Sequence, residues 1–192
     1  MQHSIAIDVM GGDHGIKVTV PASIQILNQF PNINVILVGK ETDIKKSLIK
    51  FKASNHSRIE VINATESVEM DESPQSALKN KKNSSMRLAI NLLRNKKASA
   101  CVSSGNTGAL MATARFVLKM LPGIERPAIA SNLPNENGST CVLDLGANTD
   151  STPEQLLQFA LMGAMLTSAL TKKKNPSIGL LNIGSEDIKG NE

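Results

Sequence analysis

The chain has 192 residues, with 21 Lys plus Arg against 17 Asp plus Glu and a formal net charge of +4. Because 41% of the residues are hydrophobic, the chain can bury a core typical of one domain, which excludes a disordered protein. Its longest uncharged apolar stretch, residues 159–170, is about half of the roughly 20 residues that a membrane span needs, so we expect no transmembrane helix. The amino terminus lacks a basic lead and a cleavage site, which favours the cytoplasm.

The cysteine and aromatic content narrows the class of protein further. Cys101 and Cys141 lie within short apolar stretches, as is typical of buried, reduced thiols. Aromatic residues make up 2% of the chain, with no Trp and no Tyr, so we expect no nucleic-acid partner. The lysine clusters indicate either a solvated face or a docking surface for an acidic partner. These clusters lie at 45–50, 79–82, 96–97 and 172–174.

Short β-branched runs alternate with amphipathic segments along the whole chain, and they predict strands and helices in turn. Pro21 is expected in the first turn of its helix, and either Asn83 or Ser84 is expected to cap another. In chain order we expect a strand at 4–9, a helix at 21–28, a strand at 34–38, a helix at 41–52, a strand at 58–62, a helix at 84–95, a strand at 100–103, a helix at 107–121, strands at 128–133 and 140–145, a helix from 152 to about 170, and a strand at 177–183.

Strands separated by helices of this length predict an α/β fold, with a doubly wound, mainly parallel sheet and helices on both faces. We expect one domain over residues 1–192. The last predicted strand is followed only by a polar loop, so one face of it would stay uncovered. The sequence therefore looks truncated at its carboxyl end.

Four loops rich in glycine and small polar residues follow predicted strands. Loops that leave the carboxyl ends of parallel strands meet at one edge of the sheet. Glycine lets a backbone approach a ligand closely, and a helix amino terminus offers unpaired amide donors, so such loops favour anions. The segment 81–85 adds a further helix start beside two lysines. The four loops are 8–15, 103–108, 144–150 and 184–192.

Several familiar sites are missing from the sequence. No P-loop pattern occurs, and Gly11, Gly12 and Gly15 do not fit the dinucleotide fingerprint. The three histidines are isolated and no C-x-x-C pair occurs, so we expect no metal. His14 has two interpretations, a role facing the substrate or a hydrogen bond that stabilises the local turn.

The sequence offers no obvious nucleophile. The two cysteines are mid-strand, and no G-x-S-x-G elbow surrounds a serine. If the protein is a transferase, phosphate itself is the expected attacking group. Lys189, Asn191, Asn106 and the loop amides are then suitable donors for the charge that develops during reaction.

The sequence contains five distinctive motifs, at 5–14, 81–86, 104–111, 144–148, and 179–184 with 189–192. In order and spacing they resemble those of the bacterial PlsX family, the acyl-carrier-protein:phosphate acyltransferases. The resemblance implies transfer of a fatty acyl group from acyl carrier protein to inorganic phosphate, which gives acyl phosphate for phospholipid synthesis. It also implies a fold similar to that of phosphate acetyltransferases and isopropylmalate-type dehydrogenases.

The resemblance points to Lys189 as the strongest catalytic candidate, in contact with the phosphate or the thioester oxygen. Together with the loop analysis, it gives two sets of candidates. The catalytic candidates are Lys189, Asn191 and His14. The candidates for binding substrate and phosphate are Asp8, Gly11, Gly12, Lys82, Asn83, Ser84, Gly105, Asn106, Thr107 and Asn148.

The resemblance further implies a homodimer, and we expect no cofactor. Family chains are longer, and the expected missing part holds further sheet and a helical hairpin implicated in dimerisation and peripheral membrane contact. Two alternatives stay open. One is an NAD-dependent dehydrogenase of related fold, and the other is an inactive fragment or interaction module that binds an acidic carrier protein.

Overall fold

The computed structural model describes residues 3–146, 148, 150–186 and 188–190. Its contacts divide the chain into two compact units, Met1–Lys119 and Met120–Glu192, and each is described by itself. A single domain over 1–192 stays a prediction.

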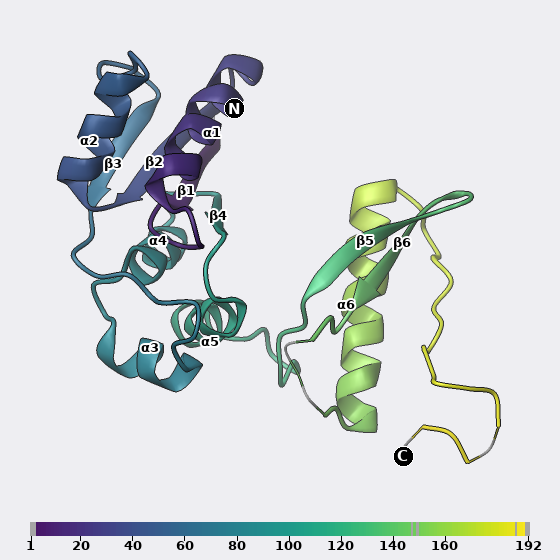
Figure 1. Cartoon of the computed structure of the whole chain (residues 1–192). Coiled ribbons are helices and arrows are strands. Elements are labelled where there is room, and N and C mark those ends of the chain that lie inside the picture. Colours follow the sequence, from purple (N-terminus) through teal and green to yellow (C-terminus); the bar gives the residue numbers. More distant parts are fainter. Residues whose placement is uncertain (1–2, 147, 149, 187, 191–192) are drawn as a thin grey trace. The chain divides into compact units, whose positions relative to one another are not determined.

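Four parallel strands form the sheet of the first unit, in the order β3-β2-β1-β4 (Figure 1). The middle strand β2 reads Ile-Asn-Val-Ile-Leu-Val-Gly, a nearly continuous apolar run typical of a parallel strand covered on both faces. β1 pairs with both β2 and β4, which places Asp8 opposite Val38 on one side and Ser103 on the other. The strands are β1 (His3–Asp8), β2 (Ile33–Gly39), β3 (Ile59–Asn63) and β4 (Ala100–Ser103).

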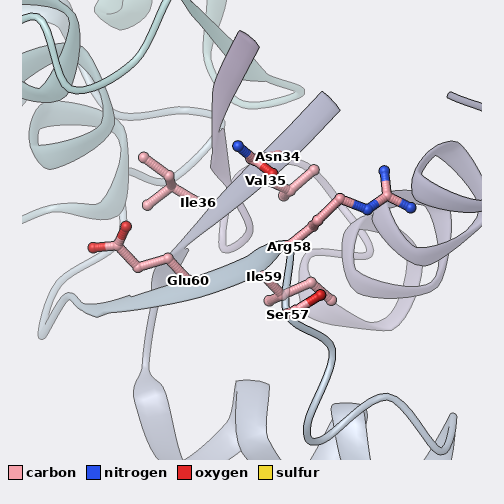
Figure 2. Close-up of a pocket in the computed structure, with 7 residues that line it drawn as sticks. All are labelled: Asn34, Val35, Ile36, Ser57, Arg58, Ile59 and Glu60. Atoms are coloured by element: carbon pink, nitrogen blue, oxygen red, sulfur yellow. The ribbon is translucent and has the colours of Figure 1, made fainter. Parts of the chain in front are cut away.

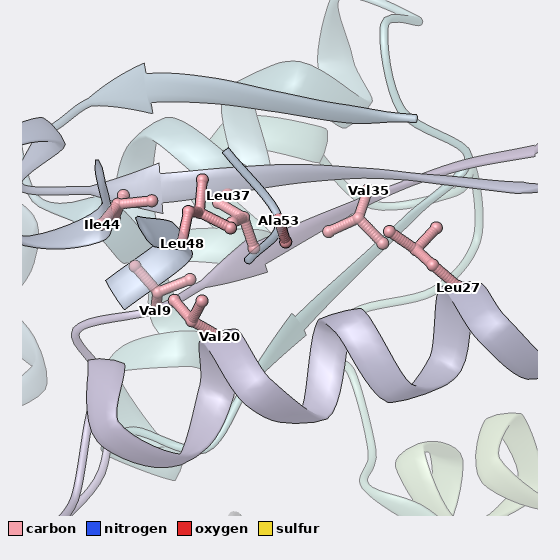
Figure 3. Packing of buried hydrophobic residues seen from close by; sticks show 8 residues of the cluster. All are labelled: Val9, Val20, Leu27, Val35, Leu37, Ile44, Leu48 and Ala53. Carbon is pink, nitrogen blue, oxygen red and sulfur yellow. The ribbon is translucent and has the colours of Figure 1, made fainter. Parts of the chain in front are cut away.

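Helices cover both faces of this sheet, which confirms the doubly wound α/β prediction. α1 and α2 pack on one face through Val20, Leu27 and Ile44, and Figure 3 shows these side chains meeting Val35 and Leu37 of β2. α4 packs on the other face, and α3 and α5 pack beside it. The helices are α1 (Ile16–Gln29), α2 (Glu41–Lys50), α3 (Pro74–Asn80), α4 (Ser85–Arg94) and α5 (Thr107–Leu118).

The second unit consists of an antiparallel hairpin and one long helix. β5 (Ala130–Asn135) pairs with β6 (Gly138–Leu143), and α6 (Pro153–Thr171) packs on β6. A capping box between Thr152 and Gln155 starts α6. Within the described residues, α6 and the other helices are all too short or too polar to cross a membrane.

One predicted strand is wrong. Residues 177–183 form neither strand nor helix, and Leu181 is 91% exposed. An apolar, β-branched run becomes a strand only where a neighbouring backbone completes its hydrogen bonds. No described strand pairs with this run.

Two helices also differ from the prediction. α1 begins at Ile16 and carries Pro21 inside it, because Val20 is buried in the core and its packing outweighs the hydrogen bond that Pro21 fails to donate. α3 was not predicted, although Ser73 caps it and Pro74 follows directly, an ordinary start signal.

The core around α2 gives a direct test of this packing. Ile44 is fully buried, whereas Ile49 on the same helix is 66% exposed. We expect Ile44→Ala to lower the free energy of unfolding by about 2–5 kcal/mol, through lost burial and the cavity it leaves. Ile49→Ala is the matched control and should change it by about 0.5 kcal/mol or less. Urea unfolding measures both, and equal losses would contradict this placement of α2.

Candidate active site

Two loops leave the carboxyl ends of neighbouring strands in the first unit. Residues 8–15 run from the last residue of β1, and residues 103–108 run from the last residue of β4 into the first turn of α5. We call these two segments the glycine loops. Because β1 and β4 are paired in parallel, both loops emerge at the same edge of the sheet.

A buried carboxyl group joins the glycine loops. Asp8 is 1% exposed, and its Oδ1 accepts hydrogen bonds from the amides of Met10 (3.3 Å) and Gly11 (3.1 Å). Its Oδ2 accepts a hydrogen bond from the Ser103 hydroxyl at 2.7 Å. The Asp8 side chain thus fixes the backbone of the first loop and holds β4, and its predicted place in the phosphate pocket stays a prediction.

Ser103 and Ser104 complete the connection. The Ser103 hydroxyl accepts from the Gly105 amide (3.1 Å), and the Ser104 hydroxyl donates to the Gly11 carbonyl (3.0 Å). Ser103 was not predicted as a site residue. The feature that could have identified Ser103 is its position at the end of a strand, opposite Asp8 in the parallel register.

The backbones of the two glycine loops touch. A Cβ on Gly11 would lie 2.6 Å from Asp8 Oδ2 and 3.0 Å from the Gly105 amide nitrogen. Gly12 adopts a positive φ of 80° and faces Ser104, so a side chain there would be strained as well as crowded. These glycines therefore allow two loops to pack where no side chain fits.

Asn106, within the second glycine loop, starts α5. Its Oδ1 accepts from the Ala109 amide at 2.9 Å, which makes it the helix N-cap. Its Nδ2 donates to the carbonyls of Glu69 (3.3 Å), Met70 (3.0 Å) and Glu72 (2.8 Å). Both ends of this amide are thus engaged in local structure, and a direct contact of Asn106 with phosphate stays a prediction.

The start of α4 lies beside these loops. Of the two predicted caps, the structure selects Ser84, whose hydroxyl accepts from the Arg87 amide at 3.3 Å. The backbone amide of Asn83 donates a hydrogen bond to Glu66 Oε2 at 2.9 Å. A Cβ on Gly105 would lie 3.2 Å from the terminal methyl of Met86, so the first turn of α4 touches the second glycine loop. We call the place where the two glycine loops and the start of α4 meet the junction.

Four further candidates of the first unit are exposed. Lys82 and Asn83 are exposed just before α4, and Thr107 is exposed at the first position of α5. His14 is exposed before α1, and its carbonyl, rather than its ring, accepts the local hydrogen bond from the Lys17 amide. The structure thus brings together the predicted residues Asp8, Gly11, Gly12 and Gly105, and leaves both interpretations of the His14 ring as predictions.

The remaining candidates belong to the second unit. Asn148 donates through Nδ2 to Asp144 Oδ1 (2.7 Å) and to the Pro127 carbonyl (3.2 Å), so it holds the loop after β6. Lys189 lies in an exposed turn, and its carbonyl accepts from Asn182 Nδ2 at 3.4 Å. Asn191 lies outside the described residues. A meeting of Asn148 and Lys189 with the glycine loops stays a prediction.

Cys101 lies mid-strand in β4 as predicted, partly buried. Burial, and secondarily the nearby Asp8 carboxyl group, raise the pKa of the Cys101 thiol to about 12. A thiol with this pKa is protonated at neutral pH and is a poor nucleophile. No cluster of His, Cys, Asp and Glu suited to a metal ion occurs among the described residues.

A shallow hollow of about 370 Å³ lies at the other end of the same sheet (Figure 2). Asn34 and Ile59 line it at the amino ends of β2 and β3, opposite the edge from which the glycine loops leave. The hollow is therefore separate from the candidate site. It is lined by Asn34, Val35, Ile36, Ser57, Arg58, Ile59 and Glu60.

Comparison with known proteins decides the family. A family model described as "Fatty acid synthesis protein" matches residues 3–192. The chain belongs to this family. It is 62% identical over 192 residues to a phosphate acyltransferase of Chromobacterium violaceum and 58% identical over 194 residues to one of Coxiella burnetii. The resemblance to the PlsX family is thereby confirmed.

The matches cover the whole of this chain but 56% and 57% of those two relatives, so the chain spans little more than half of their length. Among solved structures, the EutD phosphotransacetylase from Staphylococcus aureus is similar, with a TM-score of 0.62 and 20% identity. That match covers 88% of this chain and 54% of the other. At this identity it supports the α/β fold alone.

The contact between the glycine loops predicts a strict need for glycine at position 11. Gly11→Ala places a methyl group against the Asp8 carboxyl group and the Gly105 backbone, and we expect it to lower the free energy of unfolding by about 1–3 kcal/mol. Gly179→Ala is the control, because a Cβ there meets nothing within 4 Å. A Gly11→Ala protein as stable as the control in urea unfolding would contradict the packing.

The raised pKa of Cys101 predicts slow alkylation. At pH 8 only on the order of one Cys101 in ten thousand is a thiolate, so iodoacetamide should modify it at least about a hundredfold more slowly in the folded protein than in urea. Asp8→Asn removes the carboxylate charge, which is the smaller cause of the raised pKa of Cys101, and should raise the alkylation rate of Cys101 modestly. Peptide mass spectrometry follows the labelling, and equal rates in folded and unfolded protein would refute the burial of this thiol.

Proposed function

We propose that the protein transfers a fatty acyl group from the thioester of acyl carrier protein to inorganic phosphate and releases acyl phosphate. The observation that carries this proposal is the contact between the two glycine loops at the start of α5, in a chain whose relatives are named phosphate acyltransferase. That naming favours acyl transfer over the dehydrogenase alternative.

The junction is suited to an anion. The first amides of a helix lack partners within the helix and carry a partial positive charge. The Ala109 amide already donates a hydrogen bond to Asn106 Oδ1. The amides of Thr107 and Gly108 are therefore the ones that would donate hydrogen bonds to a phosphate oxygen. Lys82, exposed before α4, would add a full positive charge. At the glycines of these loops, no side chain blocks the approach of a ligand to the backbone.

The chemistry needs no protein nucleophile. A phosphate oxygen attacks the thioester carbonyl carbon, a carbon–oxygen bond forms, and the carbon–sulfur bond then breaks. The carrier thiol leaves with the proton that hydrogen phosphate brought, so atoms and charge balance. Cys101, with a pKa of about 12, is poorly suited to form an acyl-enzyme, which supports direct attack by phosphate.

The protein would then act by orientation and by stabilising charge on the carbonyl oxygen. Lys189 is our strongest candidate for that contact, with Asn191 and His14 as further catalytic candidates. Asn148 would hold the loop after β6 in place through Asp144. We also propose a homodimer in the cytoplasm, with peripheral membrane contact.

The test is phosphate-dependent loss of the acyl thioester in the full-length protein. We expect turnover to require phosphate, and Lys189→Ala to lower kcat by about 10²- to 10³-fold, as for loss of one donor to a developing oxyanion. Lys174→Ala is the matched control on an exposed lysine of the same unit, and its kcat should be unchanged. Thioester loss that is indifferent to phosphate would refute the function, and equal kcat values for the two variants would refute the role of Lys189.

A further inference from the structure

An exposed phenylalanine near the end of α5 contacts two cations, one on α4 and one directly after α5. Phe116 is 52% exposed, and both the Arg87 guanidinium and the Lys119 ammonium group lie 4.9 Å from the centroid of its ring. Cations over the face of an aromatic ring are attracted by its quadrupole, so Phe116 holds both long side chains close to its ring. The result is an ordered, positively charged surface around an apolar centre.

Arg94 extends this surface along α4. It lies seven residues after Arg87, about 10 Å along the helix and near the same side of it. Burial, and next the charge of Arg94, lower the pKa of Arg87, as expected when two cations lie close together. We call Arg87, Arg94, Phe116 and Lys119 the basic patch.

The basic patch begins beside the candidate site. The Arg87 amide donates to the Ser84 hydroxyl, which caps α4 at the junction with the glycine loops. The patch presents several cations spread over one turn after another of α4 and the end of α5, which suits a partner with several carboxylates. An aromatic centre with arginines around it is also the typical composition of a protein interface.

We propose that the basic patch is the docking surface for the acidic carrier protein that delivers the acyl thioester. This inference rests on the proposed function, because that function supplies the partner. Acidic side chains of the carrier would pair with Arg87, Arg94 and Lys119, while an apolar side chain packs on Phe116. Docking there would bring the thioester to the start of α4, next to the glycine loops.

The test compares two charge reversals in the full-length protein. Arg87→Glu with Lys119→Glu reverses the patch, whereas Lys46→Glu with Lys50→Glu makes the same charge change on α2, where Lys50 likewise lies over an exposed ring, that of Phe51. We expect the first pair to weaken binding of acyl carrier protein at least about tenfold and to reduce its salt dependence. The second pair should bind as the unaltered protein does.

Kinetics separate docking from chemistry. For the patch variant, KM for the acyl carrier protein thioester should rise about tenfold or more, while kcat and turnover of a small acyl thioester without carrier stay within about twofold. Phe116→Ala, which keeps every charge, should also weaken carrier binding. Circular dichroism confirms that each variant folds.

The outcomes distinguish the two proposals. Equal carrier binding by the patch and α2 variants would overturn the docking surface, and so would loss of binding to phosphatidylglycerol vesicles with carrier binding intact, which would make the patch a lipid contact. A protein that binds carrier through the patch but shows no phosphate-dependent turnover would refute the function and leave the docking surface standing.

Discussion

The hydrogen bond between Asp8 and Ser103 is the constraint on which the candidate site depends. The parallel register of β1 and β4 places the two residues opposite each other at the carboxyl edge of the sheet, and burial removes competing water from the bond. Hydrogen bonds to charged groups contribute about 1.5–3 kcal/mol. One carboxyl group thereby ties together two loops that are 95 residues apart in sequence.

The other contacts at the junction depend on this hydrogen bond. With Asp8 holding Gly11 and Ser103 holding Gly105, the two backbones meet at a spacing that only glycine allows. The start of α5 is then fixed by its cap, Asn106, and the start of α4 contacts the same loop through Met86. Two helix amino ends thus converge on one edge, which is the arrangement that favours a bound anion.

Much of this was predictable from the sequence. Apolar runs with β-branched residues gave the four parallel strands, and the rule that loops meet at the carboxyl edge identified both glycine loops. The hydrogen bond between Asp8 and Ser103 was not predictable, since a carboxyl group at a strand end fits a ligand or a loop anchor equally well, and the pairing of β1 with β4 is visible only in the structure. Residues 177–183 carry a strand pattern, yet no pattern reveals whether a partner strand lies beside them.

The most direct measurement is a double-mutant cycle of Asp8→Asn and Ser103→Ala, read as phosphate affinity by calorimetry in the full-length protein. If their hydrogen bond holds the phosphate-binding loops together, each variant weakens phosphate binding about tenfold or more, and the double variant loses little beyond either single one. Phosphate affinity that survives both substitutions in a folded protein, or losses that simply add, would contradict the account.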